Sequence, residues 1–187
     1  MTSMPTFAAI LPAGGASRRF GRNKLTQVLA GQTVLWRSVQ AFAARPDVSL
    51  VVVAGPVHVD AAKVRNVPGG SCRAETVRKA LAAVPAQIEW VAVHDAARPL
   101  VSQGLIDRVL AAAVECGAAA PALPVTLTIK QCRGPLPAPV IRTIARGELW
   151  AMQTPQILRR SALLDAYNRC PIPLDEVTDD VQLLEMT

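Results

Sequence analysis

Two segments of the 187-residue sequence combine residue types that bind phosphate groups. The first, residues 11–24, follows a short apolar stretch near the start of the chain. Its glycines let backbone N–H groups approach phosphate oxygens, and its arginines and Lys24 can neutralise phosphate charge. Gly14, Gly15 and Gly21 match neither the Walker pattern nor the dinucleotide-binding pattern. The alternative is an ordinary strand-to-helix turn with a solvated basic flank.

The second segment, residues 94–99, lies where another apolar stretch ends. Ligands of open α/β sheets bind at the carboxyl ends of strands, so Asp95 is well placed to hold a divalent ion that bridges phosphates. Two alternatives for Asp95 are a turn residue that accepts backbone N–H groups and an ion-pair partner of Arg98. We interpret His94 as a hydrogen-bonded packing residue.

The charge distribution indicates a small anionic ligand. Hydrophobic residues make up 51% of the chain, charged residues 18%, and the formal net charge is +6. The excess lies in the first 46 residues, which contain no acid, whereas residues 47–187 carry 14 charges of each sign. A basic surface that binds nucleic acid would not be expected to leave acidic and basic residues equal in number over the rest of the chain. Four of the six early cations lie in or beside the first segment: Arg18, Arg19, Arg22 and Lys24.

Composition argues against several classes of protein. Aromatic residues are only 4%, and no basic helix is visible, so we expect no nucleic-acid partner. The apolar runs are far shorter than the roughly 20 residues that span a bilayer, and the start of the chain lacks the basic region of a secretory signal, so we expect no membrane association. The four cysteines form no C-x-x-C pair, which favours reduced thiols in a cytoplasmic protein.

Short strand-like runs alternate with helical patterns, which is typical of βαβ units and a mainly parallel, buried sheet. Thr33 and Ser102 are expected to cap helices, and Gly117 to end the second of these. Thr178 is expected to cap the last helix, with Asp179 and Asp180 in its first turn. The expected strands are 7–11, 49–54 and 88–94, and the expected further helices are 74–84, 159–167 and 178–186. Residues 125–130 and 140–144 are predicted to form a Pro-rich β-hairpin that projects from the sheet.

Six motifs, in this order along the chain, resemble the 2-C-methyl-D-erythritol 4-phosphate cytidylyltransferase family. The resemblance covers essentially all of the chain. It implies a three-layer α/β/α Rossmann-like nucleotidyltransferase fold as one domain over residues 1–187, with residues 124–150 as a dimerisation arm. The motifs are Ala13-Gly14-Gly15 with Arg19, Gly21 and Lys24; Gly69-Gly70 with Arg73, Thr76 and Val77; residues 94–99; Pro124-Val125 with residues 128–130; residues 153–156; and residues 178–180.

The resemblance also implies an activity and a role for each site residue. CMP would pass from CTP to the phosphate of methylerythritol phosphate, with release of pyrophosphate, in the non-mevalonate route to isoprenoid precursors. Because an ionised phosphate is already a nucleophile, positioning and charge neutralisation can supply the catalysis. Arg19 and Lys24 would stabilise the reacting phosphates, and Asp95 would bind Mg²⁺ or another divalent cation.

The remaining roles that the resemblance implies concern the two substrates. Ala13, Gly14 and Gly15 would approach the nucleotide, with Gly70, Ser71 and Thr76 near its base and ribose. Arg98 and Thr128 would face the acceptor. Arg146 and Thr154 would reach the site of a neighbouring subunit, which implies a homodimer.

The chain departs from the family pattern in three places. Two residues separate Gly21 from Lys24 with no proline before the lysine, as in molybdenum-cofactor guanylyltransferases, so Arg18 or Arg19 could be the phosphate ligand; we prefer Arg19. Ser71 and Leu127 stand where acidic or polar residues are common. The family continues into a further strand with a substrate-binding lysine. We expect the natural chain to be longer, because a sheet without that strand exposes an unpaired edge.

Three other functions remain as alternatives at this stage. The same fold could use CTP with ribitol phosphate, or GTP with molybdopterin. A protein that binds nucleotide without turnover is the third alternative, and it belongs to another functional class.

Overall fold

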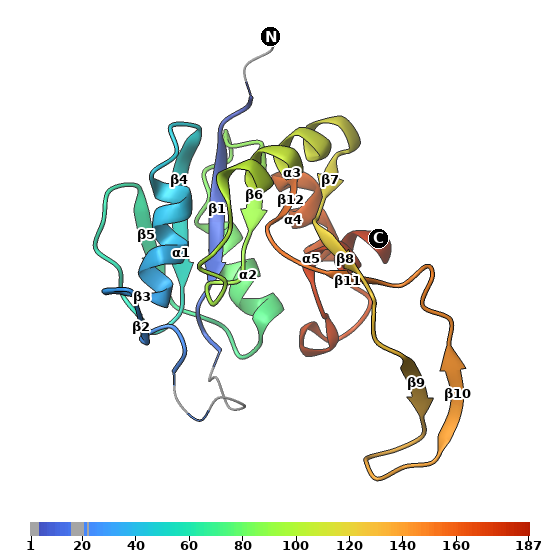
Figure 1. The fold of residues 1–187 in the computed structure, drawn as a ribbon. Helices are drawn as coiled ribbons and strands as arrows, with labels where there is room; N and C mark the ends of the chain where they lie inside the picture. Colours follow the sequence, from blue (N-terminus) through green and yellow to red (C-terminus); the bar gives the residue numbers. More distant parts are fainter. Residues whose placement is uncertain (1–3, 16–20, 22) are drawn as a thin grey trace.

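The computed structural model describes residues 4–15, 21 and 23–187, and a six-stranded sheet lies at its centre (Figure 1). The strands lie side by side in the order β5 (Val64–Val67), β4 (Val48–Ala54), β1 (Phe7–Pro12), β6 (Trp90–Val93), β12 (Gln156–Arg159) and β7 (Ala118–Ala119). β5, β4, β1 and β6 are parallel, whereas β12 is antiparallel to both of its neighbours. The predicted three-layer, mainly parallel fold is therefore confirmed.

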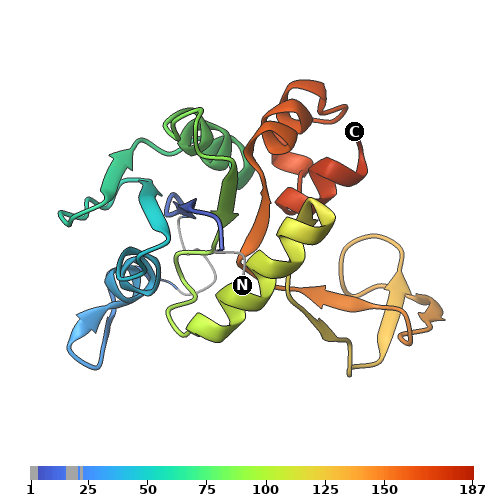
Figure 2. The same ribbon diagram turned by 90° about the horizontal axis from the view of Figure 1, so that it is seen from above.

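Helices cover both faces of the sheet (Figure 2). One layer is α1 (Val34–Ala43) and α3 (Gln103–Cys116), and the other is α2 (Arg73–Ala82), α4 (Arg160–Arg169) and α5 (Asp180–Glu185).

The central strand β1 contributes to both hydrophobic layers. Ala9 and Leu11 pack toward α1 and α3, and Ala8 and Ile10 pack toward α2, α4 and α5. Each fully buried Leu or Ile side chain contributes roughly 1.5–3 kcal/mol to the free energy of folding. Burial on both faces therefore holds the ends of the strand in fixed positions.

The caps of two helices agree with the sequence. Thr33 Oγ1 accepts from the backbone N–H of Trp36 at 3.1 Å, and Ser102 Oγ accepts from that of Leu105 at 3.2 Å. Gly117 ends α3 with φ of 89°, a left-handed conformation that suits glycine. These hydrogen bonds satisfy donors that the first helical turn leaves without partners.

The cap of α5 differs from the prediction. Asp179, not Thr178, accepts from the backbone N–H of Gln182, at 2.9 Å. Thr178 instead donates its N–H and hydroxyl to the side chain of Gln182, and the helix begins at Asp180. Asp180 is fully buried, so helix capping does not explain it.

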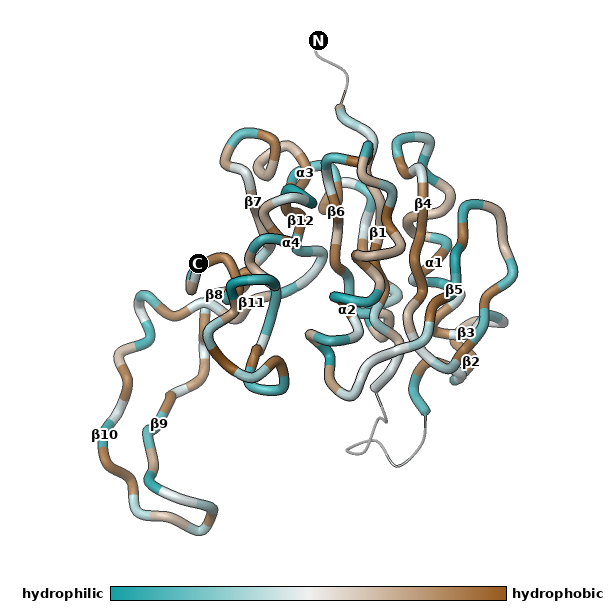
Figure 3. The backbone as a smooth tube through the Cα atoms, turned by 180° about the vertical axis from the view of Figure 1, so that it is seen from behind, coloured by the Kyte–Doolittle hydropathy of each residue, from teal (hydrophilic) through white to brown (hydrophobic). Residues whose placement is uncertain are grey.

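Residues 122–152 leave the sheet and project from one side of the molecule (Figures 1 and 2). β8 (Ala122–Pro124) pairs with β11 (Trp150–Met152), and farther out β9 (Ile129–Cys132) pairs with β10 (Val140–Ile144). The prediction of a strand over residues 125–130 was therefore wrong in position, because the chain bends at Leu127 and pairs again only from Ile129. Hydrophobic stretches are visible both in the central strand β4 and in the projecting strand β10 (Figure 3).

Smaller elements complete the fold. β2 (Val28–Leu29) and β3 (Gln32–Thr33) form a short hairpin before α1, and a 3₁₀ turn at Leu174–Glu176 precedes α5. In the described part of the chain, no helix has the length and apolar character that a bilayer span requires.

Candidate active site

The loops that carry most of the predicted site residues follow four parallel strands that end at one edge of the sheet. Residues 13–15 follow β1, Gly55 follows β4, Gly69 and Gly70 lie after β5, and Asp95 lies after β6. Parallel strands place their carboxyl ends together, and ligands of open α/β sheets bind there. Of the residues implied as nucleotide ligands, Ala13 is buried and Gly14 and Gly15 are exposed.

The first loop packs closely against its neighbours. The backbone N–H of Ala13 donates to the carbonyl of Ala54 at 2.7 Å. A Cβ on Gly55 would lie 2.5 Å from the carbonyl carbon of Ala13, so only glycine permits this approach. A Cβ on Gly14 would come within 3.4 Å of Thr76 Oγ1. The backbone at residues 13–14 is therefore held between β4 and the first turn of α2.

Thr76 links the glycine-rich turn to α2. Its hydroxyl accepts from the backbone N–H of Gly70 at 2.9 Å and donates to the carbonyl of Cys72 at 2.8 Å. Its side chain is almost fully buried. The structure thus brings Gly14, Gly70 and Thr76 together, with Thr76 as the residue that positions the turn.

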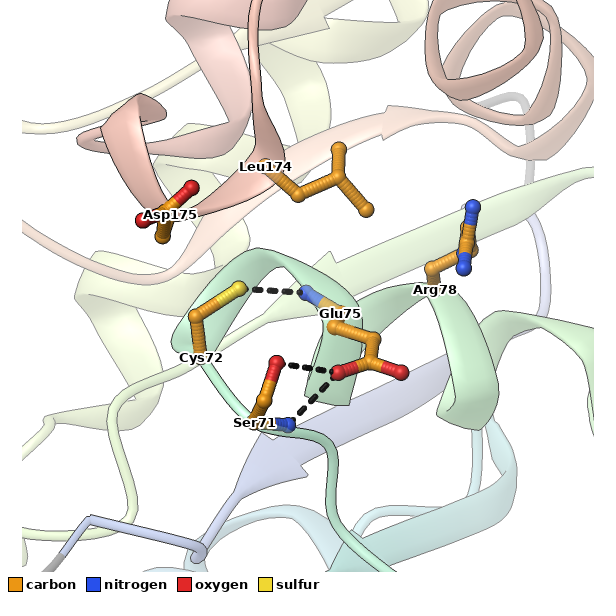
Figure 4. Close-up of a pocket in the computed structure, with 6 residues that line it drawn as sticks. All are labelled: Ser71, Cys72, Glu75, Arg78, Leu174 and Asp175. Carbon is orange, nitrogen blue, oxygen red and sulfur yellow. Dashed lines mark hydrogen bonds between the residues drawn. The ribbon is translucent and has the colours of Figure 1, made fainter.

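Glu75 is a residue that the sequence analysis did not single out. Its Oε2 accepts from the N–H and the hydroxyl of Ser71, both at 2.6 Å, and Oε1 lies 3.3 Å from Lys79 Nζ (Figure 4). These hydrogen bonds, chiefly that of the Ser71 hydroxyl, lower the pKa of Glu75 to about 2. A carboxylate is therefore present beside position 71, although that residue is itself a serine.

A cavity of about 520 Å³ lies beside this carboxylate, between the start of α2 and the segment that precedes α5 (Figure 4). The cavity has room for a group the size of a nucleobase. Its lining residues are Ser71, Cys72, Glu75, Arg78, Leu174 and Asp175.

Asp95 lies between two arginines. Arg98 Nε donates to Asp95 Oδ2 at 2.9 Å, and Arg98 also donates to the side chain of Gln153. Arg73 Nε lies 3.6 Å from Asp95 Oδ1. The interpretation of Asp95 as an ion-pair partner of Arg98 is thus confirmed, and Arg73 adds a second cation from the first position of α2.

Behind Asp95, a buried histidine and threonine support the turn. His94 is fully buried; its Nε2 is 3.0 Å from the carbonyl of Arg98 and its Nδ1 is 3.0 Å from Thr154 Oγ1. The backbone N–H of Asp95 donates to the same hydroxyl at 3.2 Å. Burial lowers the pKa of His94, so it stays neutral. The interpretation of His94 as a packing residue agrees with these contacts.

Thr154 does not lie on the exposed arm. Its side chain is buried in its own chain, beneath Asp95, whereas the resemblance implied that it would reach a neighbouring subunit. The physical reason is the turn from β11 into β12, which brings residue 154 next to the end of β6. Thr128 and Arg146, by contrast, are exposed on the arm, where Arg146 donates to the carbonyl of Thr126. Among the described residues, the contacts that join Asp95, Arg98 and Thr154 do not include them.

The buried carboxylate of Asp180 reaches the same edge from α5. Asp180 Oδ1 accepts from the Tyr167 hydroxyl at 3.1 Å, and Oδ2 lies 2.8 Å from Arg73 Nη2. Burial raises the pKa of Asp180, while the Arg73 guanidinium and the Tyr167 hydroxyl oppose that rise. Arg73 therefore joins two carboxylates, one buried and one partly exposed.

The basic end of the first segment is described only in part. Lys24 is exposed and lies in a turn that the Asn23 side chain supports by accepting from the N–H of Leu25 at 3.0 Å. The turn leads into the β2–β3 hairpin. Arg18, Arg19 and Arg22 lie outside the described residues.

Asp95 suits a particular kind of metal site. No group of three or more His, Cys, Asp or Glu side chains that could hold a metal occurs among the described residues. Mg²⁺, however, is commonly held by one or two carboxylates together with substrate phosphates and water. A single carboxylate at the edge where the glycine-containing loops converge fits that donor set.

Comparisons with known proteins show the family to which the chain belongs. The family model for 2-C-methyl-D-erythritol 4-phosphate cytidylyltransferase matches residues 7–187. This chain belongs to that family. The cytidylyltransferase of Deinococcus radiodurans is 40% identical, with 98% of this chain and 78% of the relative covered. The bifunctional enzyme IspD/IspF of Anaeromyxobacter dehalogenans is also 40% identical, with 94% of this chain and 48% of the relative covered.

Solved structures of the family share the fold. The Francisella tularensis cytidylyltransferase superposes with a TM-score of 0.84 at 29% identity, over 97% of this chain and 86% of that chain. The Thermus thermophilus enzyme gives a TM-score of 0.77 at 33% identity, over 97% of this chain and 84% of that chain. This chain thus spans about half the length of the bifunctional relatives, and 78% of the D. radiodurans protein.

Proposed function

We propose that this protein transfers CMP from CTP to 2-C-methyl-D-erythritol 4-phosphate, giving 4-diphosphocytidyl-2-C-methylerythritol and pyrophosphate. The observation that carries the proposal is the family match over residues 7–187. The convergence of residues 13–15, Gly70 and Asp95 at one sheet edge supports it. The D. radiodurans relative and the two solved structures carry this cytidylyltransferase name. The A. dehalogenans relative is named IspD/IspF, and none of the four is named for ribitol phosphate or molybdopterin.

The proposed reaction is a single displacement at the α-phosphorus of CTP. An oxygen of the acceptor phosphate forms the new P–O bond, and the bond from the α-phosphorus to the bridging oxygen breaks. Pyrophosphate leaves with that electron pair. An ionised phosphate needs no general base, so the protein contributes position and positive charge.

For the residues that the structure describes, the position of the side chain or backbone supports the proposed role. The exposed backbone of Gly14 and Gly15 can approach the nucleotide, and Gly70, Ser71 and Thr76 form the adjoining turn. Lys24, together with Arg19, is proposed to neutralise the reacting phosphates.

Asp95 is proposed to hold a divalent cation, which supplies charge neutralisation on the triphosphate when bound. Arg98, which binds Asp95 and Gln153 here, is proposed to turn to the acceptor phosphate, since it is exposed and a guanidinium binds phosphate with two donors. Thr154 supports Asp95 from within the same chain.

We further propose a homodimer formed through the arm. Residues 122–152 expose apolar side chains that a second copy could cover. They are Leu123, Leu127, Leu136, Val140, Ile141, Trp150 and Met152. Thr128 and Arg146 lie on this arm and are proposed to serve the partner's site. We propose a cytoplasmic location on the ground that all four cysteines are free thiols.

The test is pyrophosphate release measured with CTP, UTP and GTP, each against methylerythritol phosphate and ribitol phosphate. We expect turnover with CTP and methylerythritol phosphate, and at least about tenfold less with the other pairs, the scale of one lost site contact. Nucleotide binding without turnover on this pair would overturn the proposal, and turnover only with GTP or only with ribitol phosphate would favour the corresponding alternative.

A further inference from the structure

Arg73 contacts two carboxylates that differ in burial and distance. Its Nη2 is 2.8 Å from Asp180 Oδ2, and its Nε is 3.6 Å from Asp95 Oδ1. The Asp180 side chain is 1% exposed and that of Asp95 is 32% exposed. Attraction grows as distance falls and as water is excluded, so Asp180 is the stronger partner.

Asp180 is held firmly in its position. Its backbone N–H donates to Gln156 Oε1 at 2.9 Å, and Gln156 is itself buried in β12. Its side chain accepts from the Tyr167 hydroxyl at 3.1 Å. The carboxylate is therefore a fixed anchor, and the guanidinium of Arg73 is the group that must adjust to it.

The two oxygens of Asp95 differ in what they bind. Oδ2 accepts from Arg98 at 2.9 Å. Oδ1 lies 3.6 Å from Arg73, which is longer than a hydrogen bond. With Arg98 on Oδ2, as in this structure, closure of Arg73 onto Asp95 would place a guanidinium on both oxygens, and the carboxylate would have no open position for a cation.

We propose that Asp180 is a positioning residue that holds Arg73 away from Asp95, so that Asp95 Oδ1 stays open to a divalent cation. The inference rests on the proposed function, because the cation is the one that would join Asp95 to the triphosphate. Asp180 acts through Arg73 and touches no reacting atom. Groups that orient metal ligands in this way affect metal affinity even though they never contact the metal.

The test is the binding of Mn²⁺, followed by electron paramagnetic resonance of the free ion. Protein is saturated with a CTP analogue whose α,β-bridging oxygen is replaced by methylene, so that no reaction occurs.

Asp180→Asn, which keeps the shape of the side chain, is expected to raise the Kd for Mn²⁺ about tenfold or more. Tyr167→Phe keeps the Asp180 charge and is expected to bind Mn²⁺ like the wild type. Asp165→Asn, at an exposed carboxylate of α4, is the matched control.

A second pair of variants separates positioning from packing. Arg73→Gln removes the guanidinium, so we expect Mn²⁺ to bind at least as tightly as to the wild type. Arg73→Gln combined with Asp180→Asn should also bind like the wild type, because no guanidinium remains to close onto Asp95. Arg108→Gln, at an exposed position of α3, controls for the loss of a positive charge.

Each outcome decides the inference. Unchanged Mn²⁺ affinity in Asp180→Asn overturns it, and so does a double variant as weak as Asp180→Asn alone. If Asp180→Asn does not fold, Arg73→Gln and the double variant decide. Weaker Mn²⁺ binding by Arg73→Gln overturns the inference. Mn²⁺ binding at or above wild-type affinity by both of these variants supports it. If the wild-type protein binds neither the analogue nor Mn²⁺, the proposed function is overturned, and this inference, which rests on it, is overturned as well.

Discussion

At the carboxyl edge of the sheet, several polar side chains are buried and hydrogen-bonded within the chain, whereas along residues 122–152 apolar side chains lie exposed. His94, Thr154 and Asp180 are each less than a tenth exposed and hydrogen-bonded at the sheet edge. On the arm, Leu127 and Leu136 are 75% and 81% exposed. A buried polar group without a partner is costly, and a large exposed apolar surface commonly marks an interface.

The sheet edge and the arm differ in whether a single chain completes them. The sheet edge orients Asp95 through hydrogen bonds inside the chain, so its geometry does not require a second copy. The arm has little core of its own, and its apolar surface gains most from contact with another surface.

Shortening a core side chain should affect stability far more than shortening an arm side chain. Leu158 in β12 is fully buried, so Leu158→Ala is expected to lower the free energy of unfolding by about 2–5 kcal/mol. Leu136→Ala, at a position 81% exposed, is expected to change it by less than about 0.5 kcal/mol. Urea unfolding followed by circular dichroism measures both. Equal losses in the two variants would show that the arm packs as a core.

Removal of the Lys24 charge should affect catalysis and leave the fold intact. Lys24→Ala is expected to lower kcat about 100-fold or more, the scale of one lost preorganised charge. Steady-state pyrophosphate release gives kcat, and Lys63→Ala, at another exposed lysine, is the control. Near-wild-type kcat in Lys24→Ala would mean that the first segment does not bind the reacting phosphates.

A charge placed on the arm should affect association and leave monomer stability unchanged. Trp150 is 58% exposed in β11, and Trp150→Glu is expected to weaken the proposed dimer at least about tenfold, because aromatic residues often dominate interfaces. Analytical ultracentrifugation measures the association constant. Glu148→Gln, on the same arm, is the control, because it changes a charge without removing an apolar side chain. Wild-type protein that stays monomeric at micromolar concentration would contradict the dimer.

The pH dependence of stability should carry a contribution from His94. Burial lowers the pKa of the folded protein's His94 below 6.5, so below that pH the unfolded chain takes up a proton that the folded protein does not. The free energy of unfolding should therefore fall as pH decreases from about 7 to 5, with a slope from this group of at most about 1.4 kcal/mol per pH unit. His94→Gln should flatten the dependence, whereas His58→Gln, at an exposed position, should not. An unchanged slope in His94→Gln would contradict a neutral buried imidazole.

The sequence predicted those elements whose signals are local. Thr33, Ser102 and Gly117 are residue types with strong preferences at helix ends, and their helices lie where expected. Strand β5 was missed because its sequence, Val64–Val67, is half polar, and pairing with β4 rather than composition makes it a strand. The reversal of β12 relative to β6 also depends on tertiary pairing that no local pattern records.

Within the candidate site, the sequence located loops better than contacts. Asp95 and residues 13–15 were found because glycine and carboxylate residues follow apolar strands. Asp180 was assigned to the first turn of a helix capped by Thr178, where its sequence neighbours explain it fully as a favourable acid. Its partner Arg73 lies more than a hundred positions away, and only the fold brings the two together. Glu75 was missed since its bond to Ser71 depends on the shape of the turn before α2.

The proposed reaction requires the acceptor phosphate to attack the α-phosphorus of CTP. Methylerythritol phosphate labelled with ¹⁸O in the non-bridging oxygens of its phosphate allows a direct test by ³¹P nuclear magnetic resonance and mass spectrometry. All label is expected to stay in the cytidine diphosphate product, with one labelled oxygen bridging its two phosphorus atoms, and the released pyrophosphate is expected to carry none. Labelled pyrophosphate, or a product without labelled oxygen between its phosphorus atoms, would contradict the proposed reaction.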